Sequence, residues 1–265
     1  MKLAVLDKDG TLTTPISGDK FSQSPQDQRL LPGVREAIDR LRSDGWSLAI
    51  ASNQGGCDWF EISAINLKVD QKFQIIDSDD AENPFSGDDF TVKSAEYDSV
   101  GFVVEADIQD FGFCTTDRVL VQYKTIEEAI EECQFAADLC GIDNAMFCPR
   151  MDGQRCIDMV KTLDAVYDQP ETEDRIWKVG ELNCDGILIE NYRKPGAGML
   201  TWANISTQLD DWLDRIMIGD RPEDKAAAHA AGFRFMDADK WRDGASAEVV
   251  NGISNQKQTR RTDRD

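Results

Sequence analysis

Histidine is almost absent from this chain, and long apolar runs are missing altogether. The single histidine, His229, stands among alanines in the segment 226–230, where a packing or surface role is a simpler interpretation than catalysis. No stretch has the roughly 20 apolar residues that a membrane span needs. The N-terminus also lacks a basic region followed by an apolar one, the pattern of a signal peptide. We therefore expect a protein without membrane contact in which His229 is not a catalyst.

Basic residues are also in short supply. The 265 residues include 29 Lys and Arg against 50 Asp and Glu, so the formal net charge is −21, and the sequence pI is about 4.4. Such an acidic excess repels anions at long range and argues against a broad nucleic-acid surface, which is normally basic. A local positive pocket is still compatible with it. The chain also has no GxxxxGK[ST] phosphate loop, so a kinase activity is not supported.

The cysteines do not form the pattern of a disulfide scaffold. There are seven of them, an odd number, and they are spread along a chain that is long enough for an ordinary core. We expect reduced thiols and a cytoplasmic protein.

Strand-like and helix-like segments alternate over most of the chain. We predict helices at 33–44, 125–140, 197–213 and 223–231 from their apolar stripes, and strands at 2–6, 47–51, 144–147, 215–218 and 233–236 from short apolar runs. This alternation predicts an α/β fold, a doubly wound parallel sheet of Rossmann type. Residues 157–192 are acidic and irregular, and we expect a disordered tail at 251–265.

Residues 63–122 break this rhythm, and we place the inserted domain at 57–122. Short β-branched or aromatic runs at 72–76, 90–92, 100–105, 111–113 and 118–122 are separated by Asp, Gly, Asn and Pro. Such spacing predicts a small antiparallel sheet or barrel, which resembles an SH3-type barrel. We interpret it as an insertion into a discontinuous core of residues 1–56 and 123–250. The insertion is either a bystander or a part that gates substrate or binds an unknown partner.

Four short polar motifs carry the chemistry, and three of them follow an apolar run directly. Open α/β sheets hold their ligands at the carboxyl ends of the strands. Two carboxylates at positions i and i+2 repel each other unless a proton or a cation lies between them, and such a pair suits a nucleophile, a proton-transferring partner and a shared Mg²⁺. In chain order the motifs are Asp7-Lys8-Asp9-Gly10-Thr11, Ser52-Asn53-Gln54, Arg193-Lys194-Pro195 and Gly219-Asp220-Arg221-Pro222-Glu223-Asp224.

Together these motifs resemble the haloacid dehalogenase superfamily of aspartyl phosphatases. The resemblance covers residues 1–56 and 123–242. Within the superfamily the chain is similar to the small-capped phosphatases that act on histidinol phosphate, on heptose bisphosphate and on polynucleotide 3′ ends. The stretch Ser17-Gly18-Asp19-Lys20-Phe21 is most similar to the polynucleotide 3′-phosphatase.

The resemblance implies two roles at the first motif. Asp7 is the nucleophile that forms an aspartyl-phosphate intermediate. Asp9 protonates the leaving oxygen, later activates water, and offers its backbone carbonyl to Mg²⁺. We expect Lys8 to point away from the site, because side chains alternate along an extended segment.

The other motifs supply phosphate and metal contacts by the same resemblance. Ser52 donates a hydrogen bond to a phosphoryl oxygen, with the backbone N–H of Asn53 nearby, and Lys194 neutralises the moving charge. Arg193 is a candidate substrate contact, because a guanidinium can hold phosphate through two bonds. The implied Mg²⁺ ligands are Asp7, Asp9, Asp220 and, as an auxiliary ligand, Asp224.

The cysteines depart from one branch of this family. The heptose and histidinol phosphatases pair Cys-x-His with a later Cys-x-Cys in a zinc loop. This chain has Cys148 followed by Arg150 where that pattern has histidine, then Cys156 and Cys184 without a Cys-x-Cys. A four-ligand zinc site is therefore disfavoured, and whether these cysteines bind a metal stays open.

We expect an Mg²⁺-dependent phosphomonoester hydrolase, with polynucleotide 3′-phosphatase as the named candidate. The alternative substrate is a small metabolite such as histidinol phosphate or a sugar phosphate. A different class of function, a scaffold acting through the inserted β-domain, is the second hypothesis.

Overall fold

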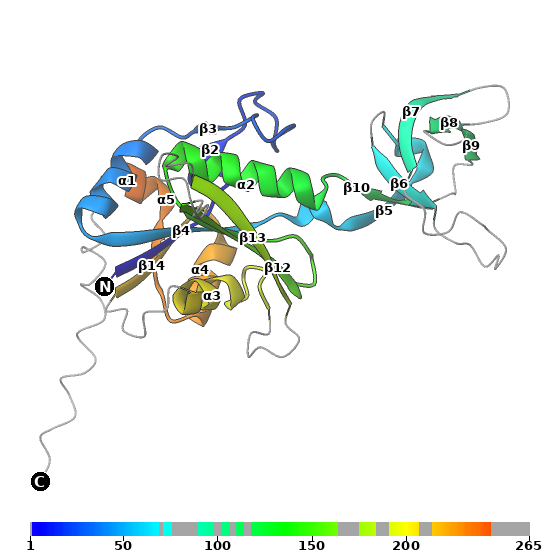
Figure 1. Cartoon of the computed structure of the whole chain (residues 1–265). Helices are drawn as coiled ribbons and strands as arrows, with labels where there is room; N and C mark the ends of the chain where they lie inside the picture. Colours follow the sequence, from blue (N-terminus) through cyan, green and yellow to red (C-terminus); the bar gives the residue numbers. More distant parts are fainter. Residues whose placement is uncertain are drawn as a thin grey trace, which may run out of the picture. The chain divides into compact units, whose positions relative to one another are not determined.

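The fold was analysed in a computed structural model of the whole chain (Figure 1). The structure describes residues 2–68, 71–75, 90–97, 102–106, 110–113, 118–163, 175–183, 191–206 and 214–244. The predicted tail at 251–265, the end of the predicted helix at 207–213, and Cys184 lie outside them. The chain divides into two compact units, unit 1 within Met1–Gln54 and Glu127–Asp265, and unit 2 within Gly55–Ile126.

Unit 1 is built on a seven-stranded sheet with the order β13-β12-β11-β4-β1-β14-β15. Five of its strands pair in parallel, which confirms the predicted α/β fold. The central strand β1 is flanked on both sides, and its Leu6 lies opposite Ile50 of β4 and Ile218 of β14. The parallel strands are β1 (Lys2–Leu6), β4 (Trp46–Asn53), β11 (Asn144–Cys148), β14 (Asp214–Gly219) and β15 (Arg234–Asp237).

Helices cover both faces of this sheet. Figure 1 shows α1 (Val34–Ser43) and α2 (Ile126–Cys140) on one side, and α3 (Gly198–Ser206) and α4 (Pro222–Ala230) on the other. The core on the α3–α4 side joins alternate residues of β1 with small and apolar helix residues, namely Leu3, Val5, Met199, Leu200, Ala227 and Ala228. A short helix, α5 (Ala238–Arg242), follows β15. Among the described residues no helix has the length and apolarity to cross a membrane.

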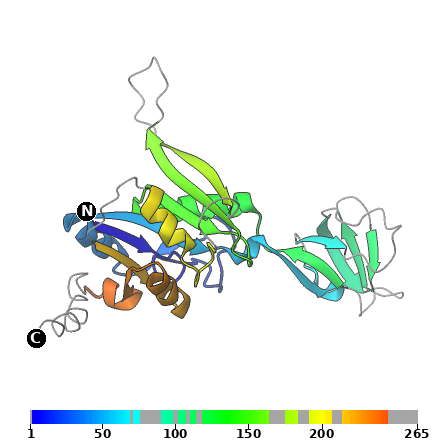
Figure 2. The same ribbon diagram turned by 90° about the horizontal axis from the view of Figure 1, so that it is seen from below.

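The segment predicted to be irregular contains a long hairpin instead. Strands β12 (Arg155–Leu163) and β13 (Arg175–Asn183) pair antiparallel over their full lengths, and β12 extends the main sheet beside β11 (Figure 2). Cys156 and Met159 of β12 are buried. Acidic residues around them in the sequence hide this strand from prediction. The prediction failed because strong local charge outweighed a short apolar signal.

A small flap follows the first motif. Strands β2 (Thr13–Thr14) and β3 (Arg29–Leu30) pair antiparallel and close a loop of residues 15–28. The carboxylate of Asp27 organises the loop, because it accepts hydrogen bonds from the amide and hydroxyl of Ser17, both at 2.7 Å, and from the amide of Gln23 at 2.9 Å. These bonds hold the pKa of Asp27 below its usual range.

Unit 2 is a six-stranded antiparallel sheet with the order β5-β10-β6-β7-β8-β9. Its core is aromatic and β-branched, with Phe73, Phe90, Val104, Val119 and Val121 buried. The five predicted runs all form strands, and β5, which carries Trp59 and Phe60, was not predicted. Its elements are the 3₁₀ turns Gly55–Cys57 and Ala64–Asn66 and the strands β5 (Trp59–Ser63), β6 (Lys72–Ile75), β7 (Phe90–Tyr97), β8 (Phe102–Ala106), β9 (Asp110–Phe113) and β10 (Arg118–Gln122).

The two ends of unit 2 are bonded to each other. The amides of Tyr123 and Lys124 donate to the carbonyl of Gly56 at 3.2 and 3.0 Å. The side chain of Gln122 donates to the carbonyl of Cys57 at 2.7 Å. The chain therefore enters and leaves unit 2 at one place, which we call the stalk (residues 55–58 and 122–126).

Candidate functional site

The site forms at the carboxyl ends of β1, β4 and β14, with a fourth contribution from the segment before α3. Asp7 follows β1 directly, and its amide donates to the carbonyl of Ile218 in β14 at 2.9 Å. Gly10 turns the chain with φ of 83°. A Cβ at Gly10 would lie 2.4 Å from Oδ2 of Asp220, so the turn brings the first motif against the last one.

A buried ammonium joins the motifs. Nζ of Lys194 forms an ion pair with Oδ1 of Asp7, lies 2.7 Å from Oδ1 of Asp224, and donates to the carbonyl of Ala51 at 2.9 Å. Burial alone would lower the pKa of Lys194, but the two carboxylates outweigh it and the pKa is raised. Lys194 is therefore a permanent positive charge between two buried acids.

The nucleophile candidate is strongly desolvated. Burial raises the pKa of Asp7 to about 7; the neighbouring Lys194 opposes this, while Asp224 and Asp9 add to it. A second cation beside Asp7 would favour its charged form, because an opposite charge at close range stabilises a carboxylate.

Three carboxylates are arranged in a way that suits such a cation. Asp7, Asp220 and Asp224 each offer one oxygen, and these oxygens lie within 4.8 Å of one another. Asp220 is exposed at the mouth of this group, and partial burial raises its pKa. The hydroxyl of Thr11 lies 3.4 Å from both Asp7 and Asp220. Oxygen ligands of this kind are those that hard divalent cations such as Mg²⁺ prefer.

The two predicted phosphate-binding residues on β4, Ser52 and Asn53, make different contacts. Ser52 is buried at the end of β4, and its Oγ accepts a hydrogen bond from Nε2 of Gln54 at 2.9 Å. The side chain of Asn53 grips the backbone of Lys194, donating to its carbonyl at 2.9 Å and accepting from its amide at 3.0 Å. Asn53 thus fixes the lysine backbone, a side-chain role that the sequence did not suggest. The proposed role of its N–H stays a prediction.

Arg193 is half-buried beside this group. Its amide donates to Oδ1 of Asn191 at 2.8 Å. Its Nη1 atom is buried and has no hydrogen-bond partner within the described part of the chain. The contact of Arg193 with an anionic substrate stays a prediction.

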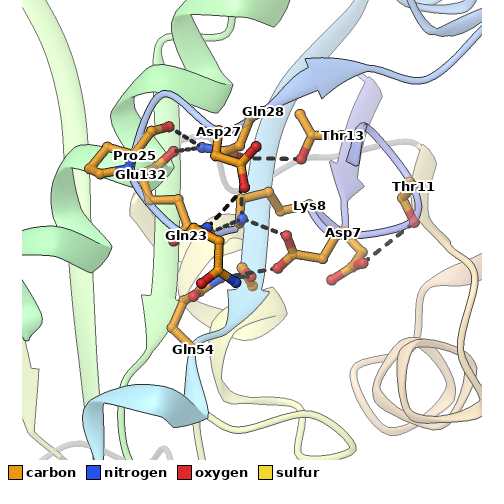
Figure 3. A network of polar contacts seen from close by, with 12 residues as sticks. Asp7, Lys8, Thr11, Thr13, Gln23, Pro25, Asp27, Gln28, Gln54 and Glu132 are labelled. Carbon is orange, nitrogen blue, oxygen red and sulfur yellow. Dashed lines mark hydrogen bonds and ion pairs between the residues drawn. The ribbon is translucent and has the colours of Figure 1, made fainter. Parts of the chain in front are cut away.

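Asp9 lies apart from the three-carboxylate group. Its Oδ1 is 2.5 Å from Nζ of Lys8, and its Oδ2 accepts from Nε2 of Gln54 at 3.1 Å. We expected Lys8 to point away from the site; instead its side chain is fully buried, pairs with Asp9 and also contacts Oε1 of Glu132 at 2.5 Å (Figure 3). Burial would lower the pKa of Lys8, but Asp9 and Glu132 outweigh it and raise it.

Several residues of the site have no signature in the sequence. Gln28 and Glu132 enter it only through long-range contacts, because they are 104 positions apart in the chain and still bond to each other. Arg242 of α5 donates to the carbonyls of Gly10 and Thr11 at 3.0 and 2.7 Å and so holds the motif turn. The sequence did not predict this network, because Lys8 was expected to point away from the site.

Two of the three cysteines of the possible zinc loop, Cys148 and Cys156, lie in the described part of the chain. Cys148 and Cys156 are fully buried, and the thiol of Cys148 donates to the carbonyl of Arg150 at 3.2 Å. Within the described ranges the potential metal ligands gather only as the three carboxylates above.

Comparison with known proteins gives local matches. No protein-family model matches the chain. It is 41% identical over 56 residues to D-glycero-β-D-manno-heptose-1,7-bisphosphate 7-phosphatase of Bordetella bronchiseptica, covering 21% of this chain and 30% of that protein. It is 35% identical over 63 residues to D-glycero-D-manno-heptose-1,7-bisphosphate 7-phosphatase of Thermosynechococcus vestitus, covering 23% and 31%. The chain thus spans about a third of the curated relatives it matches.

Solved structures resemble it distantly. The D,D-heptose 1,7-bisphosphate phosphatase of B. bronchiseptica, crystallised with magnesium and phosphate, aligns over 89% of this chain and 79% of that one, with a TM-score of 0.39 and 21% identity. A HAD-like phosphatase from Mesorhizobium loti aligns over 88% and 69%, with a TM-score of 0.44 and 16% identity.

The fold and the site define an α/β protein whose parallel strands deliver buried carboxylates, a hydroxyl and a lysine to one edge. Four motifs in fixed order meet around Asp7, and the sequence matches above are to proteins of the same kind. This arrangement is the one that the resemblance to the haloacid dehalogenase superfamily predicts.

Proposed function

We propose that this protein is a phosphomonoester hydrolase that works through an aspartyl-phosphate intermediate and depends on Mg²⁺. The observation that carries the proposal is the buried group of Asp7, Lys194 and Asp224, with Asp220 beside it. A carboxylate nucleophile, a fixed positive charge and a set of oxygen ligands are the parts that phosphoryl transfer requires.

The proposed reaction uses Asp7 and Lys194 together with Asp9. An oxygen of Asp7 attacks phosphorus, the bond from phosphorus to the leaving oxygen breaks, and Asp9 gives its proton to that oxygen. Water then attacks the phosphoryl group, Asp9 takes a proton from it, and Asp7 is released as a carboxylate. Lys194 stays charged throughout and stabilises the negative charge that builds up on the phosphoryl oxygens.

Asp7, Asp220 and Asp224 are the side chains that would hold the metal, and their carboxylate oxygens fit a hard cation. When bound, Mg²⁺ supplies charge neutralisation and a fixed orientation for the phosphate. The raised pKa of Asp7 supports this need for a cation, because the same burial that makes Asp7 reactive also disfavours its charged form.

A small sugar phosphate is the substrate class that the comparisons favour. The relatives are named as heptose-bisphosphate phosphatases, and the net charge of −21 disfavours a polyanion. Both points support the metabolite alternative over the polynucleotide 3′-phosphatase. The flap stretch from Ser17 to Phe21 is the remaining argument for the latter. A cytoplasmic location and a partner for unit 2 stay proposals.

The decisive experiment compares the wild type with Asp7→Asn. Inorganic phosphate release is measured with Mg²⁺ on sugar phosphates, histidinol phosphate and a 3′-phosphorylated oligonucleotide, with Asp44→Asn at the end of α1 as the control. We expect the wild type and the control to turn over a sugar phosphate, and Asp7→Asn to lose all turnover while it melts cooperatively. A folded Asp7→Asn protein that keeps most of its turnover would overturn the proposal. Preference for the oligonucleotide would restore the polynucleotide hypothesis, and no release from any substrate would support a scaffold.

A further inference from the structure

Lys8 lies at the centre of a buried polar network that links three parts of unit 1 (Figure 3). Its Nζ is 2.5 Å from Oδ1 of Asp9, 2.5 Å from Oε1 of Glu132 and 3.3 Å from Oε1 of Gln28. The Lys8 and Glu132 side chains are 0% and 4% exposed. Charges so deeply buried are unfavourable unless they are paired, so the pairs keep each other in one arrangement.

Asp9 is held at both of its carboxylate oxygens. Lys8 donates to Oδ1, and Nε2 of Gln54 donates to Oδ2 at 3.1 Å. The same Gln54 nitrogen reaches Oγ of Ser52 at 2.9 Å. A carboxylate with a donor on each side cannot rotate freely, so its orientation in the site is set by these two neighbours.

Glu132 is in turn fixed by its surroundings. It lies on α2, and its backbone carbonyl accepts a hydrogen bond from Nε2 of Gln28 at 3.0 Å. Gln28 also donates to the carbonyl of Pro25 at 2.7 Å and accepts from the hydroxyl of Thr13 at 3.3 Å. Lys8 therefore has a buried anion on the side away from Asp9, and the helix that carries this anion is bonded to Gln28.

We propose that Lys8 and Glu132 are positioning residues that hold the Asp9 carboxyl group where it exchanges its proton with the substrate. The inference rests on the proposed function. When the bond from phosphorus to the leaving oxygen breaks, the proton of Asp9 moves to that oxygen, and the carboxylate that remains is the form to which Lys8 and Gln54 donate. The same orientation serves the return step, in which Asp9 takes a proton from the attacking water.

The consequence is a selective dependence on the leaving group. The alkoxide of a sugar phosphate is a poor leaving group and needs the proton of Asp9. The p-nitrophenolate ion is stable and departs without one. Misplacing Asp9 should therefore slow alkyl phosphates far more than p-nitrophenyl phosphate, whereas general structural damage to the site would slow both alike.

The test uses the double variant Lys8→Met, Glu132→Met. Replacing a buried ion pair by apolar residues of similar size is often neutral for stability, whereas removing one partner leaves a buried charge unpaired. kcat and KM are measured with Mg²⁺ on p-nitrophenyl phosphate and on the sugar phosphate that the wild type hydrolyses fastest. We expect kcat/KM on the sugar phosphate to fall roughly 100-fold, which is the lower end of general acid–base effects, with kcat/KM on p-nitrophenyl phosphate nearly kept. This ratio isolates the leaving group because kcat/KM reports only the steps up to its departure, whereas the later water step, which both substrates share, enters kcat.

The matched control removes a different ion pair. Arg234 and Asp214 lie 2.5 Å apart near the amino ends of β15 and β14, away from the site, so Arg234→Met with Asp214→Leu should keep the wild-type ratio of the two rates. If the double variant fails to fold, Glu132→Gln replaces it. The amide keeps the size of the side chain but removes the charge that holds Lys8 between two anions, so this variant should shift the ratio in the same direction.

An equal loss on both substrates, or no loss on either, would overturn the positioning role. A different result would overturn the proposed function itself, namely an Asp7→Asn variant that hydrolyses p-nitrophenyl phosphate as fast as the wild type does.

Discussion

The turn after β1 leaves no space for a side chain. Gly10 has φ of 83°, a conformation that costs an L-residue roughly 1–2 kcal/mol. Its backbone also approaches Asp220 so closely that a Cβ would meet a carboxylate oxygen at 2.4 Å. Gly45 has a similar φ of 77°, but nothing lies within 4 Å of the position of its Cβ.

Comparing these two glycines separates the cost of a positive φ, which both have, from the cost of a steric clash, which only Gly10 would have. We expect Gly10→Ala to displace Asp220 and to raise the Mg²⁺ concentration needed for half-maximal activity by about tenfold or more, equivalent to about 1.4 kcal/mol. Gly45→Ala should lower the melting temperature to a similar extent without changing the Mg²⁺ requirement. Both are measured by Mg²⁺ titration of phosphate release and by thermal unfolding. Equal Mg²⁺ requirements for the two variants would refute the close contact.

For single residues, the sequence identifies the site residues that stand in short motifs better than those that join the site only through contacts between distant parts of the chain. Asp7, Lys194, Asp220 and Asp224 could be found because each belongs to a compact motif whose order is informative, and the structure brings them together. Glu132 could not be found, since an acid in a helix is ordinarily a solvated one. The burial of Lys8 depends on that same distant residue.

Among the elements, the stalk of unit 2 is the feature with the clearest consequence. The amide of Lys124 donates to the carbonyl of Gly56 at 3.0 Å, so the ends of the intervening segment already touch. Every residue assigned to the site belongs to unit 1. Closing a short gap between such ends costs little conformational entropy.

We therefore expect that replacing residues 57–123 by two glycines leaves unit 1 folded. The shortened protein should unfold in a single thermal transition and keep its Mg²⁺-dependent turnover of p-nitrophenyl phosphate, measured beside the full chain. Selective loss on the sugar phosphate would assign substrate selection to unit 2. A folded protein without turnover on p-nitrophenyl phosphate would contradict the expectation that unit 1 alone carries the site.

The elements also show where sequence patterns fail. The parallel strands of unit 1 were predictable because buried strands read as continuous apolar runs between helices. Strand β13 could not be predicted in this way, because its Ile176 and Val179 are exposed and stand among charged residues beside an acidic run. Strand β5 was missed for a related reason, since its position beside β10 depends on a partner about 60 residues away.

For the whole molecule, net charge is the dominant physical quantity. A protein of formal charge −21 repels a phosphate dianion before the site can bind it. We expect kcat/KM for p-nitrophenyl phosphate to rise as KCl increases from about 10 mM to about 100 mM, because the Debye length falls from roughly 30 Å to roughly 10 Å. Initial rates at fixed Mg²⁺ and low substrate concentration measure this. A fall in kcat/KM would mean that the positive charges near Lys194 outweigh the net charge of the molecule.

The stalk also has an evolutionary meaning. Because the chain leaves and rejoins unit 1 at neighbouring points, a single in-frame insertion or deletion there changes unit 2 and leaves the order of the strands in unit 1 unaltered. Selection can therefore act on the accessory sheet independently of the residues around Asp7. A change confined to these neighbouring points would replace the accessory sheet as one piece.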